Sequence, residues 1–325
     1  MKIYRVNEPN GDFVETIVPD PVAKAGEVLV RIRASGVNPL DTKIRAGQAA
    51  HAKQPLPAVL GLDMAGVVEE VGEGVTAFKR GDEVYGMTGG VGGLQGSLAE
   101  FVAADANLLA HKPKRLSMRE AAALPLSVIT AWEGLVDRAG VHAGQTVLVH
   151  AGAGGVGHVA VQIAHAYGAQ VFATVSADKA EIARRFGATA IDYKALAAEE
   201  YVANCTGGAG FDVVYDTVGG KTLDDSFASV RRYTGHVLSC LGWGSHSLAP
   251  LSFRGATYSG VFTLLPLITG EERAHHGEIL AAAARLTDEG KLTPLLAEES
   301  FDGSTIGKSH ALVVGGSLGK VVVEF

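Results

Sequence analysis

Three glycines at a fixed spacing, Gly152, Gly154 and Gly157, form the pattern G-x-G-x-x-G. A nucleotide pyrophosphate can approach a backbone closely only where no Cβ stands in the way, and glycine meets that requirement. The pattern has this meaning when a strand precedes it and a helix follows, because the helix directs unpaired N–H groups and a positive dipole end at the phosphates. The alternative is a glycine-rich turn without a ligand.

The residues around the glycines predict both flanking elements. Val147, Leu148 and Val149 form a short apolar run, mostly β-branched, that predicts a buried strand. From residue 156 to residue 167, apolar residues recur at the spacing of one helix face. This context favours nucleotide binding over the empty turn, and Gly152 and Ala153, which open the turn, are included among the predicted cofactor contacts.

The residues after the next strand indicate which dinucleotide binds. That strand is expected at 169–175, and NAD-binding proteins usually carry an Asp or Glu at its end to hold the ribose 2′-hydroxyl. This chain has Ser176 there, with Lys179 three residues further on. A hydroxyl and an ammonium suit a 2′-phosphate, which a carboxylate would repel, so the sequence favours NADP over NAD. Asp178 is interpreted instead as an N-terminal charge of the helix expected over 178–186.

The whole chain limits the class of protein. Its 325 residues predict two domains, and a hydrophobic content of 47% is enough for large cores. The formal net charge of −7 argues against a nucleic-acid partner, which requires a basic face. Cys205 and Cys240 are the two cysteines; they cannot build a disulfide framework and indicate a cytoplasmic setting. We expect no signal peptide and no membrane span, because the apolar stretches are too short.

The expected elements change character along the chain. Residues 1–105 are predicted to be all-β and barrel-like, with strands at 27–32, 65–71 and 98–102. Helices begin near Ser117, where Ser117 and Glu120 form the S-x-x-E pattern of a capping box. Strands and helices then alternate, which predicts an α/β doubly wound parallel sheet covered on both faces. The strands of this sheet are expected at 146–150, 170–175, 189–192, 211–216 and 235–241.

Two loops follow strands of this predicted sheet at their carboxyl ends, where open α/β sheets bind ligands. They are residues 216–219 and 240–242, and Leu241 in the second loop is a predicted cofactor contact. The tail is expected to contain a helix from about residue 273 to 289 and a closing strand over 320–325.

Four stretches in order resemble the medium-chain dehydrogenase/reductase superfamily, and most of all its zinc-free quinone oxidoreductase branch, which includes zeta-crystallin. They are residues 36–47, 61–86 and 124–135 and the glycine turn. The resemblance implies a discontinuous GroES-like β-barrel catalytic domain (1–122 and 263–325) and a Rossmann NADP-binding domain (123–262), with the cofactor in the cleft between them. It also implies a homodimer or homotetramer that pairs edge strands of the Rossmann domain, for which residues 251–262 are the candidate.

The resemblance also implies roles for individual residues. Asn38 and Asp41, from an N-P-x-D motif, would line the pocket near the nicotinamide, and Thr130 would lie near its carboxamide. Gly154, Gly155, Val156 and Gly157 would hold the pyrophosphate, while Ser176, Lys179 and Tyr193 would hold the adenosine phosphate end. Lys320, in a terminal G-K-V-V pattern, is a further cofactor candidate. Structural alternatives exist: Asn38 as a turn former, Asp41 as a partner of nearby backbone and Lys320 as a surface lysine.

The same resemblance bears on metal binding. Zinc-dependent members use a Cys near the position of Asn38 and a His in a G-H-E motif, where this chain has Leu62, which cannot ligate a metal. His158, Gln162 and His165 share one helix face opposite the apolar stripe and are interpreted as surface polar residues. We therefore expect no zinc. Without a Lewis acid, substrates that accept hydride easily are favoured, namely quinones and α,β-unsaturated carbonyls.

The choice between a quinone and an enone or enal stays open. Related quinone reductases carry tyrosines just after the N-P-x-D motif, whereas residues 43–57 contain none. His51 and Lys43 are the side chains there that resemble a proton donor, and no general acid is assigned, since solvent can supply the proton. Two other hypotheses are an NADPH-binding protein of low turnover and a zinc alcohol dehydrogenase.

Overall fold

The computed structural model describes residues 1–325, which fall into two compact units. The first unit comprises Met1–Ile129, Leu264–Gly290 and Pro294–Phe325, and the second comprises Thr130–Thr263 and Lys291–Thr293. No helix is both long and apolar enough to cross a membrane.

The first unit is built on two β-sheets. A small antiparallel sheet has the order β2-β1-β4, and a larger sheet has the order β15-β16-β3-β5-β6-β8, with β7 also paired to β3. The strands are β1 (Lys2–Val6), β2 (Phe13–Ile17), β3 (Glu27–Val37), β4 (Ala58–Val59), β5 (Asp63–Val71), β6 (Glu83–Met87), β7 (Phe101–Asp105), β8 (Leu109–His111), β15 (Phe301–Asp302) and β16 (Val321–Glu324). The long strand β3 pairs with β5, β7 and β16 and so organises this sheet.

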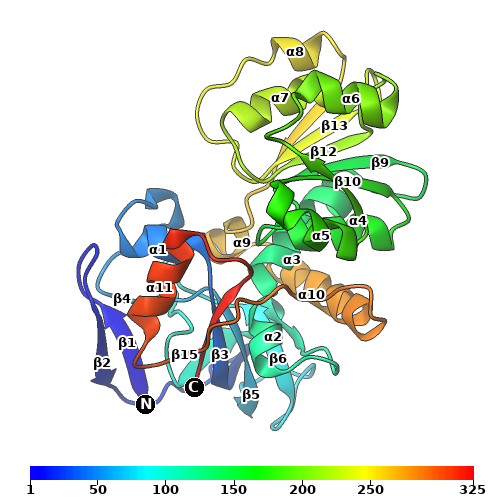
Figure 1. Ribbon diagram of the computed structural model, residues 1–325. Helices are drawn as coiled ribbons and strands as arrows, with labels where there is room; N and C mark the ends of the chain where they lie inside the picture. Colours follow the sequence, from blue (N-terminus) through cyan, green and yellow to red (C-terminus); the bar gives the residue numbers. More distant parts are fainter. The chain divides into compact units, whose positions relative to one another are not determined.

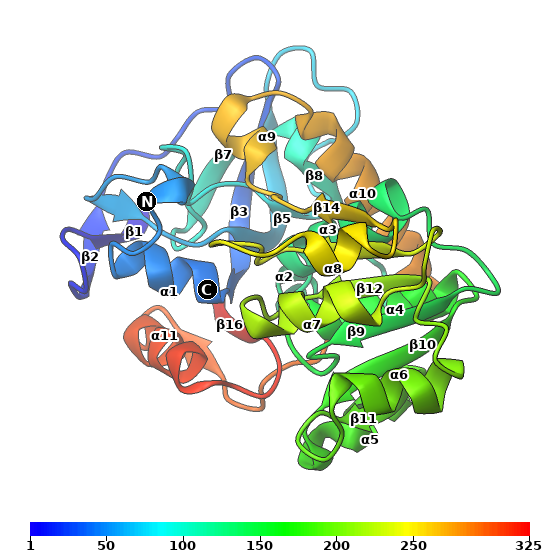
Figure 2. The ribbon, with the colours of Figure 1, turned by 90° about the horizontal axis from the view of Figure 1, so that it is seen from above.

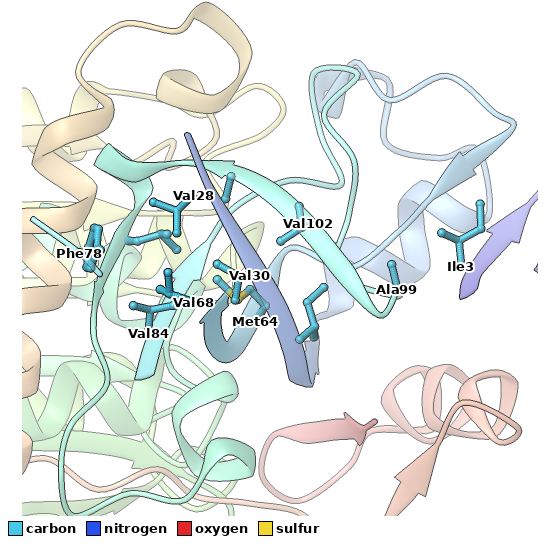
Figure 3. Packing of buried hydrophobic residues seen from close by; sticks show 12 residues of the cluster. Ile3, Val28, Val30, Met64, Val68, Phe78, Val84, Ala99 and Val102 are labelled. Carbon is cyan, nitrogen blue, oxygen red and sulfur yellow. The ribbon is translucent and has the colours of Figure 1, made fainter. Parts of the chain in front are cut away.

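Alternating side chains of these strands form the core of the first unit. Val28 and Val30 of β3 meet Met64 and Val68 of β5, and all four side chains are fully buried (Figure 3). Side chains alternate between the two faces of a strand, so burying every second residue of β3 sets its register against both neighbours.

Five helices lie wholly within the first unit, and a sixth begins in it. They are α1 (Pro39–Arg45), α2 (Met118–Ala122), α9 (Leu265–Thr269), α10 (Arg273–Asp288) and α11 (Ile306–Gly315), with α3 (Pro125–Trp132) containing the division between the units. Helix α11 packs beside α1 and β16 (Figure 2). The capping box predicted at Ser117 is confirmed: the hydroxyl accepts from the Glu120 N–H, and the carboxylate accepts from the Ser117 N–H at 2.8 Å.

The prediction that residues 1–105 are all-β is wrong at α1. Asn38 is its N-cap, Pro39 occupies its first position, and the Asp41 carboxylate accepts the Asn38 backbone N–H at 2.8 Å. Proline at the first helical position and an acidic side chain in the first turn are strong helix-start signals. The N-P-x-D motif is therefore the start of a helix, not only a turn.

The second unit contains a six-stranded parallel sheet in the order β11-β10-β9-β12-β13-β14. Its strands are β9 (Thr146–His150), β10 (Gln170–Val175), β11 (Ala188–Asp192), β12 (Val213–Asp216), β13 (His236–Ser239) and β14 (Thr257–Gly260). This order, with its reversal between β9 and β12, is that of a dinucleotide-binding doubly wound sheet. The predicted α/β class is confirmed, and the strand predicted at 146–150 is β9.

Helices cover both faces of this sheet. They are α4 (Gly157–Ala166), α5 (Ala180–Arg185), α6 (Ala198–Thr206), α7 (Lys221–Ser229) and α8 (Ala249–Ser252). Helices α4 and α5 lie on one side and α6 and α7 on the other (Figure 1). Both faces of the sheet are therefore buried, which is why its strands are continuous apolar runs in the sequence.

Strand β14 lies at one edge of the sheet, where it pairs with β13 alone. This position confirms that the segment 251–262 contains an edge strand. The outer N–H and C=O groups of such a strand are open to pairing with another chain.

Candidate active site

The glycine turn joins β9 to α4 in the second unit, and two of its glycines are sterically required. A Cβ on Gly152 would lie 2.4 Å from the Cβ of Ala173 on β10, and a Cβ on Gly157 would lie 2.1 Å from the Ala151 carbonyl oxygen. Ala151 itself has a φ of 53°, in the left-handed region. The turn is thus too tight for side chains at Gly152 and Gly157, which brings the start of α4 close to the end of β9.

A cavity of about 600 Å³ lies at the carboxyl ends of β9 and β10, beside this turn. The cavity is lined by five of the residues predicted from the sequence: Ala153, Gly154, Ser176, Lys179 and Tyr193. Gly152, Gly155, Val156 and Gly157 belong to the adjoining turn and do not line the cavity. The volume is within the range of small-molecule sites, and its place at the switch point of the sheet is where such folds bind dinucleotides.

The polar groups that follow β10 in the cavity suit a phosphate. Ser176 and Lys179 follow β10 directly, and no carboxylate stands at the end of that strand. Asp178 is exposed and does not line the cavity; a hydrogen bond from Ser176 is the largest of the effects that lower its pKa. Lys221 and Asp225 of α7 also line the cavity, where their side chains form an ion pair at 2.7 Å, and no pattern in the sequence pointed to them.

Asp216, at the end of β12, holds the neighbouring loop. It is fully buried and accepts the Gly219 N–H at 2.9 Å and the Ser239 hydroxyl at 2.7 Å. Ser239 in turn accepts the Leu241 N–H at 3.1 Å. Leu241 does not line the cavity, whereas Val218, in the loop that Asp216 holds, does.

Thr130 is a buried residue of α3, near the start of the second unit. Its carbonyl oxygen accepts the hydroxyl of Tyr215 on β12 at 2.5 Å. This bond fixes α3 against the sheet, while the assignment of Thr130 to the nicotinamide carboxamide stays a prediction.

The interpretation of His158 and Gln162 as surface residues is wrong. Both are buried on α4, and only His165 of the three is exposed. The His158 ring contacts the Gly154 carbonyl oxygen at 2.8 Å. The Gln162 amide pairs with both backbone groups of Thr293, at 3.0 and 2.9 Å. The sequence missed this because it does not show that residues 291–293 return to cover the polar face of α4.

A second group of polar residues is buried in the first unit, around the end of β3. Asn38 follows β3 directly, Asp63 opens the neighbouring strand β5, and Lys320 immediately precedes β16 on the other side. The Asn38 amide Nδ2 donates to Asp63 at 3.0 Å, and its Oδ1 accepts from the Lys320 ammonium. The Lys320 Nζ lies 4.0 Å from the Asp63 carboxylate. Lys320 is therefore not the surface lysine of the structural alternative, being only 5% exposed.

Asp41 adds a second carboxylate to this group. One of its oxygens accepts the Asn38 N–H, whereas the other is buried without a hydrogen-bond partner. Burial raises the pKa of Asp41 to about 7, with the charge of Asp63 acting in the same direction and the Asn38 N–H and Lys320 acting against it. Burial also raises the pKa of Asp63 to about 6, against the opposing charge of Lys320. Burial lowers the pKa of Lys320, which both carboxylates oppose.

Two more buried polar atoms near Asp63 lack a partner. They are the hydroxyls of Ser127 and Thr88. Ser127 follows Leu126, whose N–H donates to Asp63 at 2.9 Å, and the Thr88 N–H donates to the carbonyl oxygen of Leu62. Buried polar groups are normally hydrogen-bonded, so unpaired ones on residues next to the bonding partners of this cluster fit a place where a ligand completes the bonding.

No group of three or more His, Cys, Asp and Glu side chains is arranged to hold a metal ion. Leu62, at the position of the superfamily's metal-binding histidine, is fully buried and apolar.

Comparison with known proteins agrees with both units. Residues 24–114 match the family model described as alcohol dehydrogenase GroES-like domain, and residues 155–273 match the model described as zinc-binding dehydrogenase. The chain is 38% identical over 321 residues to a 2-methylene-furan-3-one reductase of Solanum lycopersicum, covering 96% of this chain and 75% of that one. It is 29% identical over 331 residues to a quinone oxidoreductase of Homo sapiens, covering 99% and 97%.

A solved structure shows the same fold throughout. The crystal structure of an alcohol dehydrogenase superfamily protein from Novosphingobium aromaticivorans superposes with a TM-score of 0.98 at 55% identity, covering 100% of this chain and 99% of that one.

Proposed function

Since the chain belongs to the medium-chain dehydrogenase/reductase superfamily and is an oxidoreductase, we propose that it transfers hydride from NADPH to a quinone or an α,β-unsaturated carbonyl. The observation that carries the proposal is the cavity beside the glycine turn, with Ser176 and Lys179 at the end of β10 where an NAD site has a carboxylate. One relative is named for a quinone, and the other for a ketone conjugated to a methylene group.

The parts of the cofactor site have separate tasks. The turn with Gly152, Gly154 and Gly157 and the N-terminus of α4 would hold the pyrophosphate through backbone N–H groups. Ser176, Lys179 and Tyr193 would hold the adenosine end. The bound cofactor supplies the hydride, and the protein supplies orientation, exclusion of water and hydrogen bonds. Asn38, Asp41 and Thr130 are proposed as the residues nearest the reacting groups, and Lys320 acts there through Asn38.

The experiment that tests this function measures NADPH oxidation with a benzoquinone and, separately, with an enone. Rapid oxidation with either acceptor supports the proposal, and the faster one identifies the substrate class. We propose that the reaction needs no zinc, so the rate is expected to survive incubation with a chelator. NADPH binding without oxidation by either acceptor would favour a binding protein of low turnover.

Lys179→Ala is expected to weaken NADPH binding by about tenfold to 100-fold and to leave NADH binding almost unchanged. A hydrogen bond to a charged group contributes about 1.5–3 kcal/mol, and only NADPH carries the 2′-phosphate. Fluorescence titration of both cofactors measures the two dissociation constants. Lys194→Ala is the matched control, because Lys194 is exposed and does not line the cavity. Equal weakening of NADPH and NADH binding would contradict the assignment to NADP.

We propose that two copies associate through the free edge of β14. Phe253 and Tyr233 lie near this edge, and their side chains are 86% and 85% exposed. The Tyr233 backbone N–H donates to the backbone carbonyl oxygen of Arg254, which holds the two segments together. Large apolar side chains beside an open strand edge are typical of an interface. Light scattering is expected to give twice the mass of one chain for the wild type and a single-chain mass for Phe253→Glu. A monomeric wild type would overturn this assignment.

We further propose that residues 1–122 and 263–325 form the catalytic domain and that residues 123–262 form the NADP-binding domain. We also propose a cytoplasmic location. The two free cysteines fit a reducing compartment.

A further inference from the structure

The buried cluster around Asn38 contains two carboxylates and one ammonium. Asp41 is 1% exposed, Asp63 is not exposed and Lys320 is 5% exposed. With every group ionised the cluster would hold a net charge of −1 away from water. An unpaired buried charge is strongly disfavoured, so binding one proton is the least costly way to neutralise the cluster.

The hydrogen bonds show which carboxylate takes that proton. Asp63 accepts from the Asn38 amide and the Leu126 N–H and lies next to Lys320, so its ionised form is stabilised on several sides. Asp41 accepts one N–H, and its second oxygen has no partner. An oxygen without a donor gains least from being ionised, and protonation turns it into a donor.

The surrounding elements bring no other charge that changes this balance. Helix α11 packs against α1 and carries His310, whose ring lies against Phe13. Burial and, second to it, the charge of Arg45 lower the pKa of His310. Neither His310 nor Arg45 is among the charges acting on Asp41, which are those of Asp63 and Lys320. The two neighbours act in opposite directions, since Asp63 favours the proton on Asp41 and Lys320 disfavours it.

We propose that the Asp41–Asp63–Lys320 cluster stores one proton on Asp41 and that reduction of the substrate consumes this proton. The inference rests on the proposed function. Hydride with its electron pair adds to the β-carbon of an enone, and the C=C π pair shifts to leave an enolate. The O–H bond of Asp41 then breaks, its electron pair stays on the carboxylate, and the proton forms the new C–H bond at the α-carbon. Solvent returns a proton to Asp41 before the next turnover.

Infrared spectroscopy of the cofactor-free protein tests proton storage without catalysis. A protonated buried carboxyl group has a C=O stretch separate from that of a carboxylate. We expect this band to be lost as the pH is raised through about 7, where burial places the pKa of Asp41, and to be missing in Asp41→Asn. Glu120→Gln is the matched control, because Glu120 accepts a helix-start N–H in the same way on α2 and is not among the groups that act on Asp41. A band lost at about pH 7 in Asp41→Asn as well would overturn the assignment, whereas a band lost at about pH 6 belongs to Asp63.

Steady-state kinetics tests proton delivery. Asp41→Asn is expected to lower kcat for an enone by about 100-fold, the usual contribution of a general acid, with NADPH binding unchanged. The loss for a benzoquinone is expected to be smaller, since a hydroquinone anion takes a proton from water readily. Glu120→Gln should keep the wild-type kcat. An Asp41→Asn enzyme with the wild-type kcat and pH profile would overturn the proposal.

A second variant covers the case in which Asp41→Asn does not fold. Asp63→Asn removes the neighbouring negative charge, so the infrared midpoint and the kcat inflection should both move to lower pH. No movement of either would overturn the proposal. A wild type that oxidises NADPH with neither acceptor would instead refute the proposed function and the delivery step, while the infrared titration still decides whether Asp41 stores the proton.

Discussion

Replacing Lys320 by methionine is expected to lower the free energy of unfolding by about 3–5 kcal/mol. Lys320 is the cation of a cluster that also holds two fully buried carboxylates, those of Asp41 and Asp63. Methionine fills a similar volume without the charge. The Asp63 carboxylate would then lack its counter-charge, and the Asn38 side-chain oxygen Oδ1 its donor, in an apolar interior. Urea unfolding followed by circular dichroism measures the change.

Lys221→Met is the control for this experiment. Lys221 also pairs with an aspartate, at 2.7 Å, but its side chain is 85% exposed. Exposed ion pairs of this kind contribute about 0–1 kcal/mol, so this variant should stay close to the wild type. A Lys320→Met protein as stable as Lys221→Met would contradict this prediction, because it would show that the two carboxyl groups carry no unpaired charge once Lys320 is removed.

Gly157→Ala is expected to have the second large effect, on both stability and cofactor binding. Its Cβ would lie 2.1 Å from the Ala151 carbonyl oxygen and 3.0 Å from the Cα of Gly152. These are backbone atoms of the turn, so the start of α4 must move away from β9. Overpacking typically costs about 1–3 kcal/mol, and the displaced N–H groups no longer converge on a phosphate. We expect NADPH binding to fall below detection in a fluorescence titration.

Gly307→Ala provides the comparison for the glycine substitution. Gly307 lies in helix α11, and a Cβ there would meet no atom within 4 Å. Alanine is preferred over glycine in a helix by about 0.5–1 kcal/mol, so this variant should be as stable as the wild type or slightly more stable. NADPH binding to Gly157→Ala at wild-type affinity would refute the role of the turn.

Local patterns in the sequence were enough to predict much of the second unit. The apolar run from Val147 to Val149, the glycine spacing and the helical periodicity each lie within a few residues, so their geometry follows from local rules. The five residues of the cavity that the sequence identified all lie on the turn or just after β10 and β11. The loop 216–219 was also expected at the ligand-binding edge, and its Val218 lines the cavity, whereas Lys221 belongs to no motif and was missed.

The cluster in the first unit was only partly predictable. Asn38 and Asp41 belong to a recognisable motif, whereas no role was expected for Asp63. A carboxylate followed directly by the apolar run from Met64 to Val68 was an available signal, because a buried charge requires a partner. The identity of that partner depends on sheet register: β3 brings Gly36 opposite Asp63 and Val37 opposite Val321. No local rule connects positions that far apart.

The place of β16 in the sheet has a consequence for synthesis on the ribosome. Lys320 is made 282 positions after Asn38, and β16 forms the strand next to β3. At about 5–20 residues per second, β3 waits on the order of tens of seconds for this neighbour. All strands of the second unit are translated within that interval, so we expect its sheet to pair first. Until Lys320 arrives, the nascent chain must keep the Asp63 carboxylate hydrated and the open edge of β3 away from other chains.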